Sequence, residues 1–251
     1  MQVAVVGGGA SGRAIEQALR ARGCDVTQHS RATGFDMLRE DATMRLAGAD
    51  VIVEATGMFT TSRRRATDFF GRSTRAIAAA AADLQAHHVL LSIVNCMLPT
   101  VQGYGYFAGK TIQEQIARDV SPRLTIVRST QWFEFARQNL ERMRTGPFAL
   151  VPGMTIAPVA LDSVATVVAD VATGLRTETE VDVAGPETTT LWEMTRSLPD
   201  RGVVAVPLPI PGAMGRAFRN GALVPGADAE VIGPRFAEWL GNQERADTRA
   251  G

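Results

Sequence analysis

The chain has 251 residues, 45% of them hydrophobic and 21% charged, so it is long enough to bury a sizeable core in one large α/β domain or in a domain with a small added lobe. Its 26 basic and 26 acidic side chains cancel, which gives no indication of a nucleic-acid or anionic-membrane partner. Two cysteines do not make a disulfide framework, and they and the three histidines lack metal-site spacing, so we expect no metal. Without a signal-peptide pattern or a membrane-spanning run, the protein is expected to be cytoplasmic.

The first half of the chain alternates short apolar runs with segments of helical spacing. Strands are expected at residues 3–6, 25–29, 50–55, 88–93 and 124–128. Helical patterns are expected at residues 14–19, 37–46, 62–82 and 106–118. Strands that alternate with helices predict βαβ units, and therefore an α/β fold with a Rossmann-like, doubly wound parallel sheet.

The composition and regularity of the sequence change at about Phe148. Prolines become frequent from there on, and short strands and helices mix less regularly. We therefore expect residues 1–147 to form the Rossmann-like domain and residues 148–251 to form a small C-terminal lobe. Within that lobe, residues 179–183 are a candidate for a strand that returns to the main sheet.

A glycine-rich turn follows the first expected strand and opens the first helix. Its sequence, Gly7-Gly8-Gly9-Ala10-Ser11-Gly12, fits the pattern G-x-G-x-x-G in the context that this pattern requires. The first glycine permits the tight turn, the second lets the backbone approach a pyrophosphate, and the third lets helix and strand pack closely. Because the N-terminus of the helix offers free N–H groups to phosphate, Gly7, Gly9, Ala10, Ser11 and Gly12 are predicted to bind a dinucleotide. The alternative is a fold that keeps the glycines and has lost its nucleotide.

The end of the second strand bears on which dinucleotide is bound. An acidic residue there would hold the ribose 2′-hydroxyl of NAD, but the chain has His29-Ser30-Arg31 instead. Arg31 is able to pair with a 2′-phosphate and Ser30 to hydrogen-bond to it, so NADP (as NADPH) is favoured over NAD. The alternative is that Arg31 is an ordinary loop arginine.

Two further segments are candidates for the adenosine half of the cofactor. Ala55, Thr56 and Gly57 close the third strand, where the chain would pass under the adenine-side ribose. Asp36 lies in the loop near the expected adenine and is able to accept from its amino group, or it caps a helix.

Tyr106 and Lys110 form the candidate catalytic pair. The chain has two tyrosines, Tyr104 and Tyr106, and its one lysine is Lys110, whereas every other strong base is arginine. A spacing of four residues puts Tyr106 and Lys110 on one helix face, one turn apart. A neighbouring ammonium lowers the pKa of a phenol, which suits the tyrosine to exchange a proton with a carbonyl or alcohol oxygen while a hydride moves. Lys110 would also hold the nicotinamide ribose. The alternative is a surface pair at chance spacing.

Several segments together resemble the NmrA-like branch of the atypical short-chain dehydrogenases/reductases. They are the glycine turn, the Ser-Arg after the second strand, and residues 88–94, 105–110, 113–114, 125–135, 183–187 and 236–240. The resemblance implies a Rossmann-like NAD(P)-binding sheet and catalytic positions at Tyr106 and Lys110. It also implies that the stretch containing Ser129 and Thr130 passes the nicotinamide.

The serine position departs from the family pattern. Members with dehydrogenase chemistry often carry a run of serines after the strand that corresponds to residues 88–93, and here Ser92 is followed by Ile93 and Val94. Ser92 is the catalytic candidate to polarise the substrate oxygen, and Asn95 is the alternative.

These features predict an NADPH-dependent oxidoreductase that transfers hydride to a small carbonyl or quinone-like substrate. The alternative from another class is an NmrA-like NAD(P)-binding redox sensor that regulates a partner without turnover, and an epimerase with bound NAD is less favoured. Members of this superfamily often dimerise through helices at the positions of residues 62–82 and 106–118, which makes a homodimer a further expectation. No nucleic-acid or membrane partner is expected.

Overall fold

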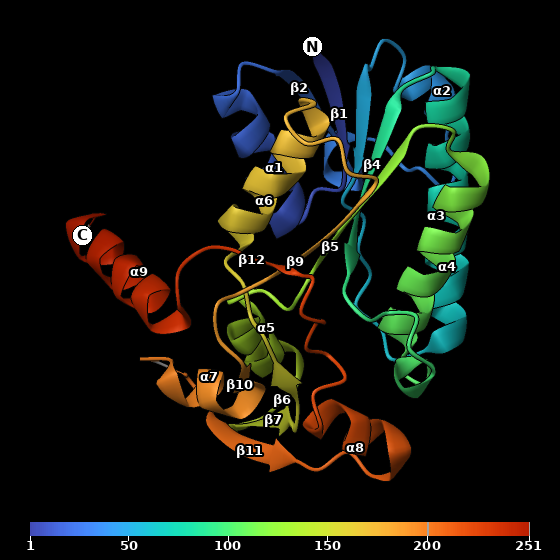
Figure 1. Ribbon diagram of the computed structural model, residues 1–251. Helices are drawn as coiled ribbons and strands as arrows, with labels where there is room; N and C mark the ends of the chain where they lie inside the picture. Colours follow the sequence, from blue (N-terminus) through green and yellow to red (C-terminus); the bar gives the residue numbers. More distant parts are fainter. Residues whose placement is uncertain (200, 251) are drawn as a thin grey trace. The chain divides into compact units, whose positions relative to one another are not determined.

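The computed structural model describes residues 1–199 and 201–250, with side chains described up to residue 245. The chain divides into two compact units (Figure 1). The first comprises Met1–Arg128 and Val164–Val181, and the second comprises Ser129–Ser163 and Asp182–Gly251. The expected domain boundary between residues 147 and 148 lies inside the second unit. A change in composition marks the start of the irregular segment, but it does not reveal that a later helix belongs to the first unit.

The first unit contains the alternating elements that the sequence predicts. They are β1 (Gln2–Val6), α1 (Ala10–Ala21), β2 (Asp25–His29), α2 (Ala42–Arg45), β3 (Val51–Glu54), α3 (Arg63–Asp83), β4 (His87–Ile93), α4 (Gly105–Val120) and β5 (Leu124–Ser129). The unit also contains most of α6 (Leu161–Ala172), a helix that the sequence analysis did not predict. The helical pattern over residues 37–46 overestimates α2. Asp36 begins a separate turn, in which its backbone oxygen accepts from Arg39 and Glu40, and Asp41 caps a helix of four residues.

The main sheet has seven strands in the order β12-β9-β5-β4-β3-β1-β2, where β9 is Glu180–Ala184 and β12 is Glu230–Val231. β1 pairs in parallel with both β2 and β3, and β3 pairs in parallel with β4. The strand order therefore reverses at β1, and the carboxyl ends of β1 and β3 form the switch point at which open α/β sheets bind ligands. This confirms the predicted Rossmann-like doubly wound sheet, and β9 confirms the predicted returning strand.

Helices cover both faces of the sheet in the first unit. α3 and α4 lie together on one face, and α1 and α6 lie on the other (Figure 1). α3 and α4 approach closely because Gly109 has no side chain, and a Cβ there would overlap with the Phe70 ring. On the opposite face, Arg22 at the end of α1 pairs with Asp170 of α6, at 2.7 Å. The close approach of α3 and α4 fixes the helix that carries Tyr106 and Lys110.

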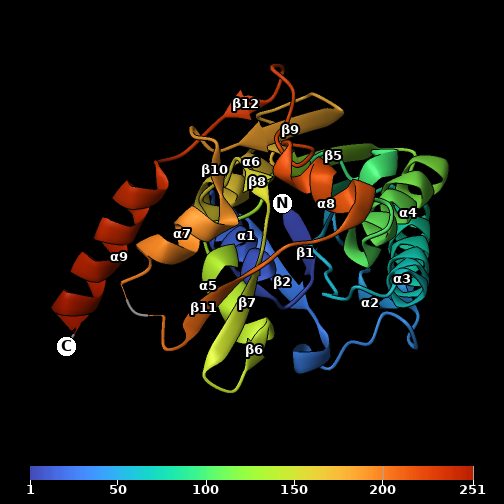
Figure 2. The same ribbon diagram turned by 90° about the horizontal axis from the view of Figure 1, so that it is seen from below.

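The second unit holds two small sheets and short helices (Figure 2). β7 (Phe148–Pro152) lies between β6 (Arg144–Thr145), to which it is antiparallel, and β11 (Val204–Leu208), to which it is parallel; β8 (Thr155–Ile156) pairs with β10 (Thr189–Thr190). The helices of this unit are α5 (Phe135–Arg142), α7 (Leu191–Ser197), α8 (Gly212–Arg219) and α9 (Phe236–Ala250). The ring of Phe133 packs against Phe236 and Trp239, which joins α9 to the segment that follows β5. Among the described residues, no helix is long and apolar enough to cross a membrane.

Candidate functional site

Three glycines of the turn after β1 lie so close to neighbouring atoms that they have no room for a side chain, whereas a fourth has open space around it. Gly7 has a φ of +136°, and a Cβ on it would overlap with the backbone oxygen of Ala55, while a Cβ on Gly12 would overlap with the oxygen of Gly7. A Cβ on Gly8 would lie 2.8 Å from Ser30 Oγ. In contrast, no atom lies within 4 Å of a Cβ built on Gly9. The turn is therefore packed against β2 and β3 and keeps bare backbone at Gly9.

The open position lies at the N-terminus of α1. Gly9 is the N-cap, with an extended backbone, and no side chain caps the helix. The N–H groups of the first turn, from Ala10 to Gly12, are the ones that a helix leaves without an internal partner. Bare backbone next to uncapped N–H groups fits a pyrophosphate, because the phosphate oxygens accept several hydrogen bonds and the helix dipole favours their charge. The structure thus brings the predicted residues of the turn together at the N-terminus of α1.

The end of β2 lies against this turn. The hydroxyl of Ser30 accepts from Thr33 N at 3.3 Å, and Thr33 Oγ1 accepts from Ser30 N at 2.8 Å. This reciprocal cap starts a short 3-10 turn, Arg31–Thr33, and leaves Arg31 exposed. Asp36 is occupied locally, because its Oδ1 accepts from Leu38 N at 3.1 Å. Arg31 is exposed and follows Ser30, whose side chain lies against Gly8, whereas Asp36 serves its own turn in this structure.

The last residue of β3 is a fully buried carboxylate, Glu54, that the sequence analysis did not identify. Glu54 Oε1 accepts from Thr74 Oγ1 at 2.7 Å, from Thr56 Oγ1 at 2.9 Å and from Gln113 Nε2 at 2.6 Å. His88 Nε2 lies 3.2 Å from Glu54 Oε2. Burial by itself raises the pKa of this carboxyl, but the hydrogen bonds of His88 and Thr74 and the charges of His88 and Lys110 hold it below its usual range. Its signal in the sequence is a single acidic residue at the end of an otherwise apolar strand.

Lys110 is buried to 3% exposure and donates to three acceptors. Its Nζ donates to Gln113 Oε1 at 2.7 Å, to the backbone oxygen of Leu91 at 2.9 Å and to the backbone oxygen of Thr56 at 3.4 Å. The ammonium also lies 5.0 Å from the centre of the Phe70 ring. An ammonium has three donors, so each has an acceptor within the protein. The bond to Thr56 places Lys110 next to Ala55, on which the glycine turn packs.

The charge of Lys110 is opposed by burial and supported by neighbouring acids. Burial lowers the pKa of Lys110 to about 8, against the opposing effects of Glu54, Cys96 and Glu114. Its ammonium is consequently titrated closer to neutral pH than an exposed lysine.

Tyr106 lies on the same helix, one turn before Lys110, and is half-buried. Its ring meets the rings of Phe70 and Phe107 edge-on, with centroids 6.0 and 6.1 Å apart. The predicted pair therefore shares the aromatic wall of Phe70, which also faces the Lys110 ammonium.

Ser92 belongs to a second buried network. Its hydroxyl donates to Glu114 Oε1 at 2.6 Å, and Arg128 bonds both oxygens of that carboxylate at 2.8 Å. Arg118 adds a bond of 3.0 Å, and Cys96 lies 3.4 Å from Glu114 Oε1. Burial raises the pKa of Glu114, but the hydrogen bond and charge of Arg128 outweigh it and hold the pKa below its usual range. The Ser92 hydroxyl is thus engaged with an acid of the protein itself.

Cys96 is buried as well, and burial raises the pKa of its thiol to about 12. It is therefore shielded from reagents rather than exposed in the loop.

Ser129 and Thr130 begin the second unit. Ser129 Oγ accepts from Trp132 Nε1 at 3.0 Å, and Thr130 N donates to the backbone oxygen of Val183 at 3.1 Å. In the same segment, Gln131 Oε1 and Glu134 Oε2 are buried without a hydrogen-bond partner among the described residues. Burial and the Asp162 carboxylate raise the pKa of Glu134.

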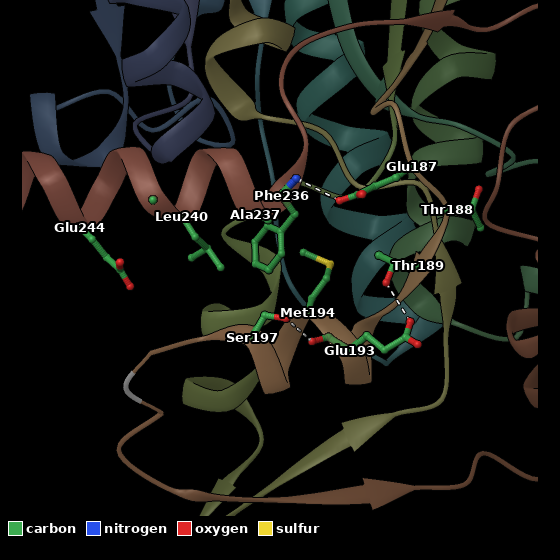
Figure 3. A pocket seen from close by; sticks show the side chains of 11 residues that line it. Glu187, Thr188, Thr189, Glu193, Met194, Ser197, Phe236, Ala237, Leu240 and Glu244 are labelled. Atoms are coloured by element: carbon green, nitrogen blue, oxygen red, sulfur yellow. Dashed lines mark hydrogen bonds between the residues drawn. The ribbon is translucent and has the colours of Figure 1, made fainter.

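A groove of 530 Å³ lies in the second unit between α7 and α9 (Figure 3). Its apolar side is formed by Met194, Phe236 and Leu240, and its polar side includes Glu187 and Glu193. Both carboxylates have structural tasks: Glu187 accepts from Phe236 N at 3.0 Å, and Glu193 accepts from Thr189 Oγ1 at 2.9 Å. None of the predicted site residues lines this groove. Within the described part of the chain, no cluster of His, Cys, Asp and Glu is suited to a metal ion.

Comparison with known proteins connects the fold to nucleotide-dependent enzymes. No family model and no curated protein sequence matches the chain. A solved structure of dTDP-4-dehydrorhamnose reductase from Clostridium acetobutylicum is similar over 98% of this chain and 100% of that one, with a TM-score of 0.71 and 14% identity. NADPH-dependent quinone oxidoreductase from Escherichia coli, complexed with NADPH, is similar over 96% and 99%, with a TM-score of 0.68 and 15% identity. A short-chain dehydrogenase/reductase superfamily protein from Agrobacterium tumefaciens with bound NAD is similar over 99% and 98%, with a TM-score of 0.62 and 16% identity. These likenesses show that the chain has the Rossmann-like fold of such enzymes.

Proposed function

We propose that the protein is an NADPH-dependent oxidoreductase of the short-chain dehydrogenase/reductase type, with Tyr106 as acid/base and Lys110 as its partner. One observation carries the proposal: three predicted features form a continuous cluster. Gly7 of the phosphate turn packs on Ala55, Thr56 follows, and the backbone oxygen of Thr56 accepts from Lys110, the sole lysine of the chain. A phosphate turn joined in this way to a tyrosine–lysine helix suits hydride transfer at the carboxyl ends of the strands.

NADPH, when bound, supplies a hydride to the carbonyl carbon of the substrate. Tyr106 donates the phenolic proton to the substrate oxygen, so that a ketone becomes an alcohol, and the tyrosine takes up a proton from solvent afterwards. With a quinone, the hydroxydienone that forms first loses its ring C–H proton to solvent and gains a proton on the other oxygen, which gives the hydroquinone. Lys110 stabilises the phenolate that forms, because its positive charge lies one helical turn away. The protein residues thus supply orientation and the proton, and the hydride chemistry belongs to the cofactor.

Lys110 also holds the nicotinamide ribose in this proposal. Because its three donors are already engaged, a ribose hydroxyl has to replace one of the present acceptors. The backbone oxygen of Thr56 is the one most easily replaced, since its distance of 3.4 Å from Nζ makes it the weakest of the three. Loss of this bond on cofactor binding would couple the loop after β3 to the occupancy of the site.

NADPH is proposed over NADH because of the end of β2. Arg31 is exposed there and no carboxylate is present to hold a ribose 2′-hydroxyl. The structural neighbours are named with NADPH in one case and with NAD in another, so the choice rests on Arg31. For the substrate, we propose a small carbonyl or quinone-like compound, which agrees with the quinone oxidoreductase among the structural neighbours.

The second candidate is an NmrA-like redox sensor that binds NADPH without turnover. The observation that favours it is the bond of 2.6 Å from Ser92 to Glu114, because a serine that serves its own fold does not polarise a substrate. Asn95 remains as an alternative polarising residue.

The test is NADPH and NADH binding to the purified protein by titration calorimetry, followed by NADPH oxidation in the presence of 1,4-benzoquinone. The oxidoreductase proposal expects tight NADPH binding, weaker binding by Arg31→Ala and turnover that Tyr106→Phe abolishes. NADPH binding without turnover by carbonyls or quinones would favour the sensor. If neither nucleotide binds, both functions are refuted.

A further inference from the structure

Gln113 joins the buried acid of β3 to the lysine of α4. Its Oε1 accepts from Lys110 Nζ at 2.7 Å, and its Nε2 donates to Glu54 Oε1 at 2.6 Å and to Thr56 Oγ1 at 3.1 Å. Gln113 is fully buried, so neither end of its amide is exposed to bulk solvent. The bridge connects residues that are 59 positions apart in the sequence, Glu54 and Gln113.

The orientation of this amide is determined by its two charged neighbours. An ionised carboxylate only accepts hydrogen bonds, and an ammonium only donates them. The NH₂ group of Gln113 must therefore point to Glu54 and its oxygen to Lys110. If the amide were reversed, its oxygen would face the carboxylate and its NH₂ group the ammonium, and both contacts would be repulsive.

The acidic groups around Lys110 affect the pKa of its ammonium to different degrees. Glu54 opposes the effect of burial on its ammonium most strongly, followed by Cys96 and Glu114. Glu114 is already paired with Arg128, which engages both of its oxygens. Burial holds the Cys96 thiol neutral, since its pKa is raised to about 12. Glu54 is consequently the buried charge that balances Lys110.

We propose that Glu54 is a positioning residue for Lys110, and that it acts through Gln113 to keep the ammonium charged and directed at the backbone oxygens of Thr56 and Leu91. Without the carboxylate, the amide of Gln113 is free to turn and Lys110 loses its strongest acceptor. The ammonium would then lack both a counter-ion and a defined place in the core.

For catalysis this inference rests on the proposed function, because only an oxidoreductase needs Lys110 beside Tyr106 and the ribose. The placement of Lys110 itself does not, and it is measurable without cofactor or substrate. The chain offers an unusual advantage here, since lysine labelled with ¹³C and ¹⁵N produces signals from one residue only.

The experiment follows the side-chain signals of Lys110 by NMR across pH, in the wild type, Glu54→Gln and Gln113→Met. The wild type is expected to titrate near the pKa of about 8 that burial imposes. Glu54→Gln keeps the shape and an acceptor but removes the charge, so Lys110 should titrate at lower pH. Gln113→Met keeps the charge and removes the bridge, so the side chain should also become more mobile. If Glu54→Gln does not fold, Gln113→Met carries the same test.

Thr74→Val is the matched control. Thr74 is fully buried and donates to the same oxygen, Glu54 Oε1, at 2.7 Å, but it does not contact Lys110 in any described interaction. Its loss should destabilise the fold and leave the lysine titration nearly unchanged. The inference is overturned if Thr74→Val moves the lysine signals as much as the other two variants, or if none of the three moves them.

Steady-state kinetics separate this inference from the proposed function. With 1,4-benzoquinone, Glu54→Gln and Gln113→Met should lower kcat and weaken NADPH binding by about tenfold each, the usual effect of losing a charge-assisted bond, with little change in the KM of the quinone. Shifted lysine signals together with no turnover by the wild type would refute the oxidoreductase and leave the positioning role intact. Turnover that both variants retain in full, with unmoved lysine signals, would refute the positioning role alone.

Discussion

Replacing Gly9 by alanine should weaken nucleotide binding without harming the fold. No atom lies within 4 Å of a Cβ at this position, and the φ of −78° and ψ of −171° are open to any residue. The new side chain reduces the freedom of the unfolded chain, while alanine is a poorer N-cap than glycine, so the free energy of unfolding should change by less than about 1 kcal/mol.

The cost appears only when a pyrophosphate approaches the turn. The methyl group of Gly9→Ala would occupy the space through which the phosphate reaches the N–H groups of α1. Each charge-assisted hydrogen bond lost is worth about 1.5–3 kcal/mol, so NADPH affinity should fall about tenfold to 150-fold for a single bond and further for two.

The assay combines urea unfolding with calorimetric titration of NADPH. Two controls bracket the result. Gly226→Ala adds a methyl group in equally open space in the second unit and should change neither stability nor binding. Gly12→Ala should unfold more easily, by about 1–3 kcal/mol, because its Cβ would overlap with the backbone oxygen of Gly7. If Gly9→Ala bound NADPH as tightly as the wild type, the phosphates would not lie on this turn.

Four further outcomes are expected. Arg31→Ala should weaken NADPH about tenfold to 150-fold and leave NADH unchanged, as measured by titration; equal losses for both nucleotides would contradict the 2′-phosphate assignment. Tyr106→Phe should keep NADPH affinity and lose turnover by about 10²–10⁴-fold in single-turnover kinetics; a smaller loss would move the proton transfer to another group. Arg128→Met should cost about 3–5 kcal/mol in urea unfolding, because it leaves the Glu114 carboxylate buried without its main partner. Since the pKa of Glu114 is held below its unfolded value, the stability that its ionised form contributes is present at neutral pH and is lost as the pH falls below about 4.5; a Glu114→Gln variant should lack that acid-sensitive component, and an identical acid transition would argue against it.

The periodicity of apolar residues in the sequence was sufficient to predict most of the helices and strands. The run at residues 25–29 is confirmed as β2, and the alanine-rich pattern at residues 62–82 corresponds to α3 within one residue at each end. These elements bury one continuous face or are wholly apolar, so the pattern of their own side chains specifies them. The pattern at residues 37–46 was misleading, because the turn at Asp36 and the cap at Asp41 use local hydrogen bonds that compete with a longer helix.

The candidate site was predictable only in part. The glycine turn was identified because such a turn needs residues without side chains, and only glycine provides them. In the structure, a Cβ on Gly7 or Gly12 would overlap with a backbone oxygen, which explains these two glycines. The roles of Arg31, Tyr106 and Lys110 toward a cofactor stay predictions. Ser92 was a reasonable candidate from its position near the end of β4, but its bond to Glu114 depends on a helix that follows later in the chain.

The sequence by itself determined the alternation of strands and helices, the phosphate turn, and the presence of one lysine a helical turn from a tyrosine. These are properties of neighbours in the chain, and backbone geometry alone converts them into structure. Only the tertiary structure decided the order of the strands and the surroundings of Lys110. Glu54 and Gln113 meet only in the folded chain, and the buried carboxylate of Glu54 is stabilised by groups such as His88 and Gln113 that are distant in sequence.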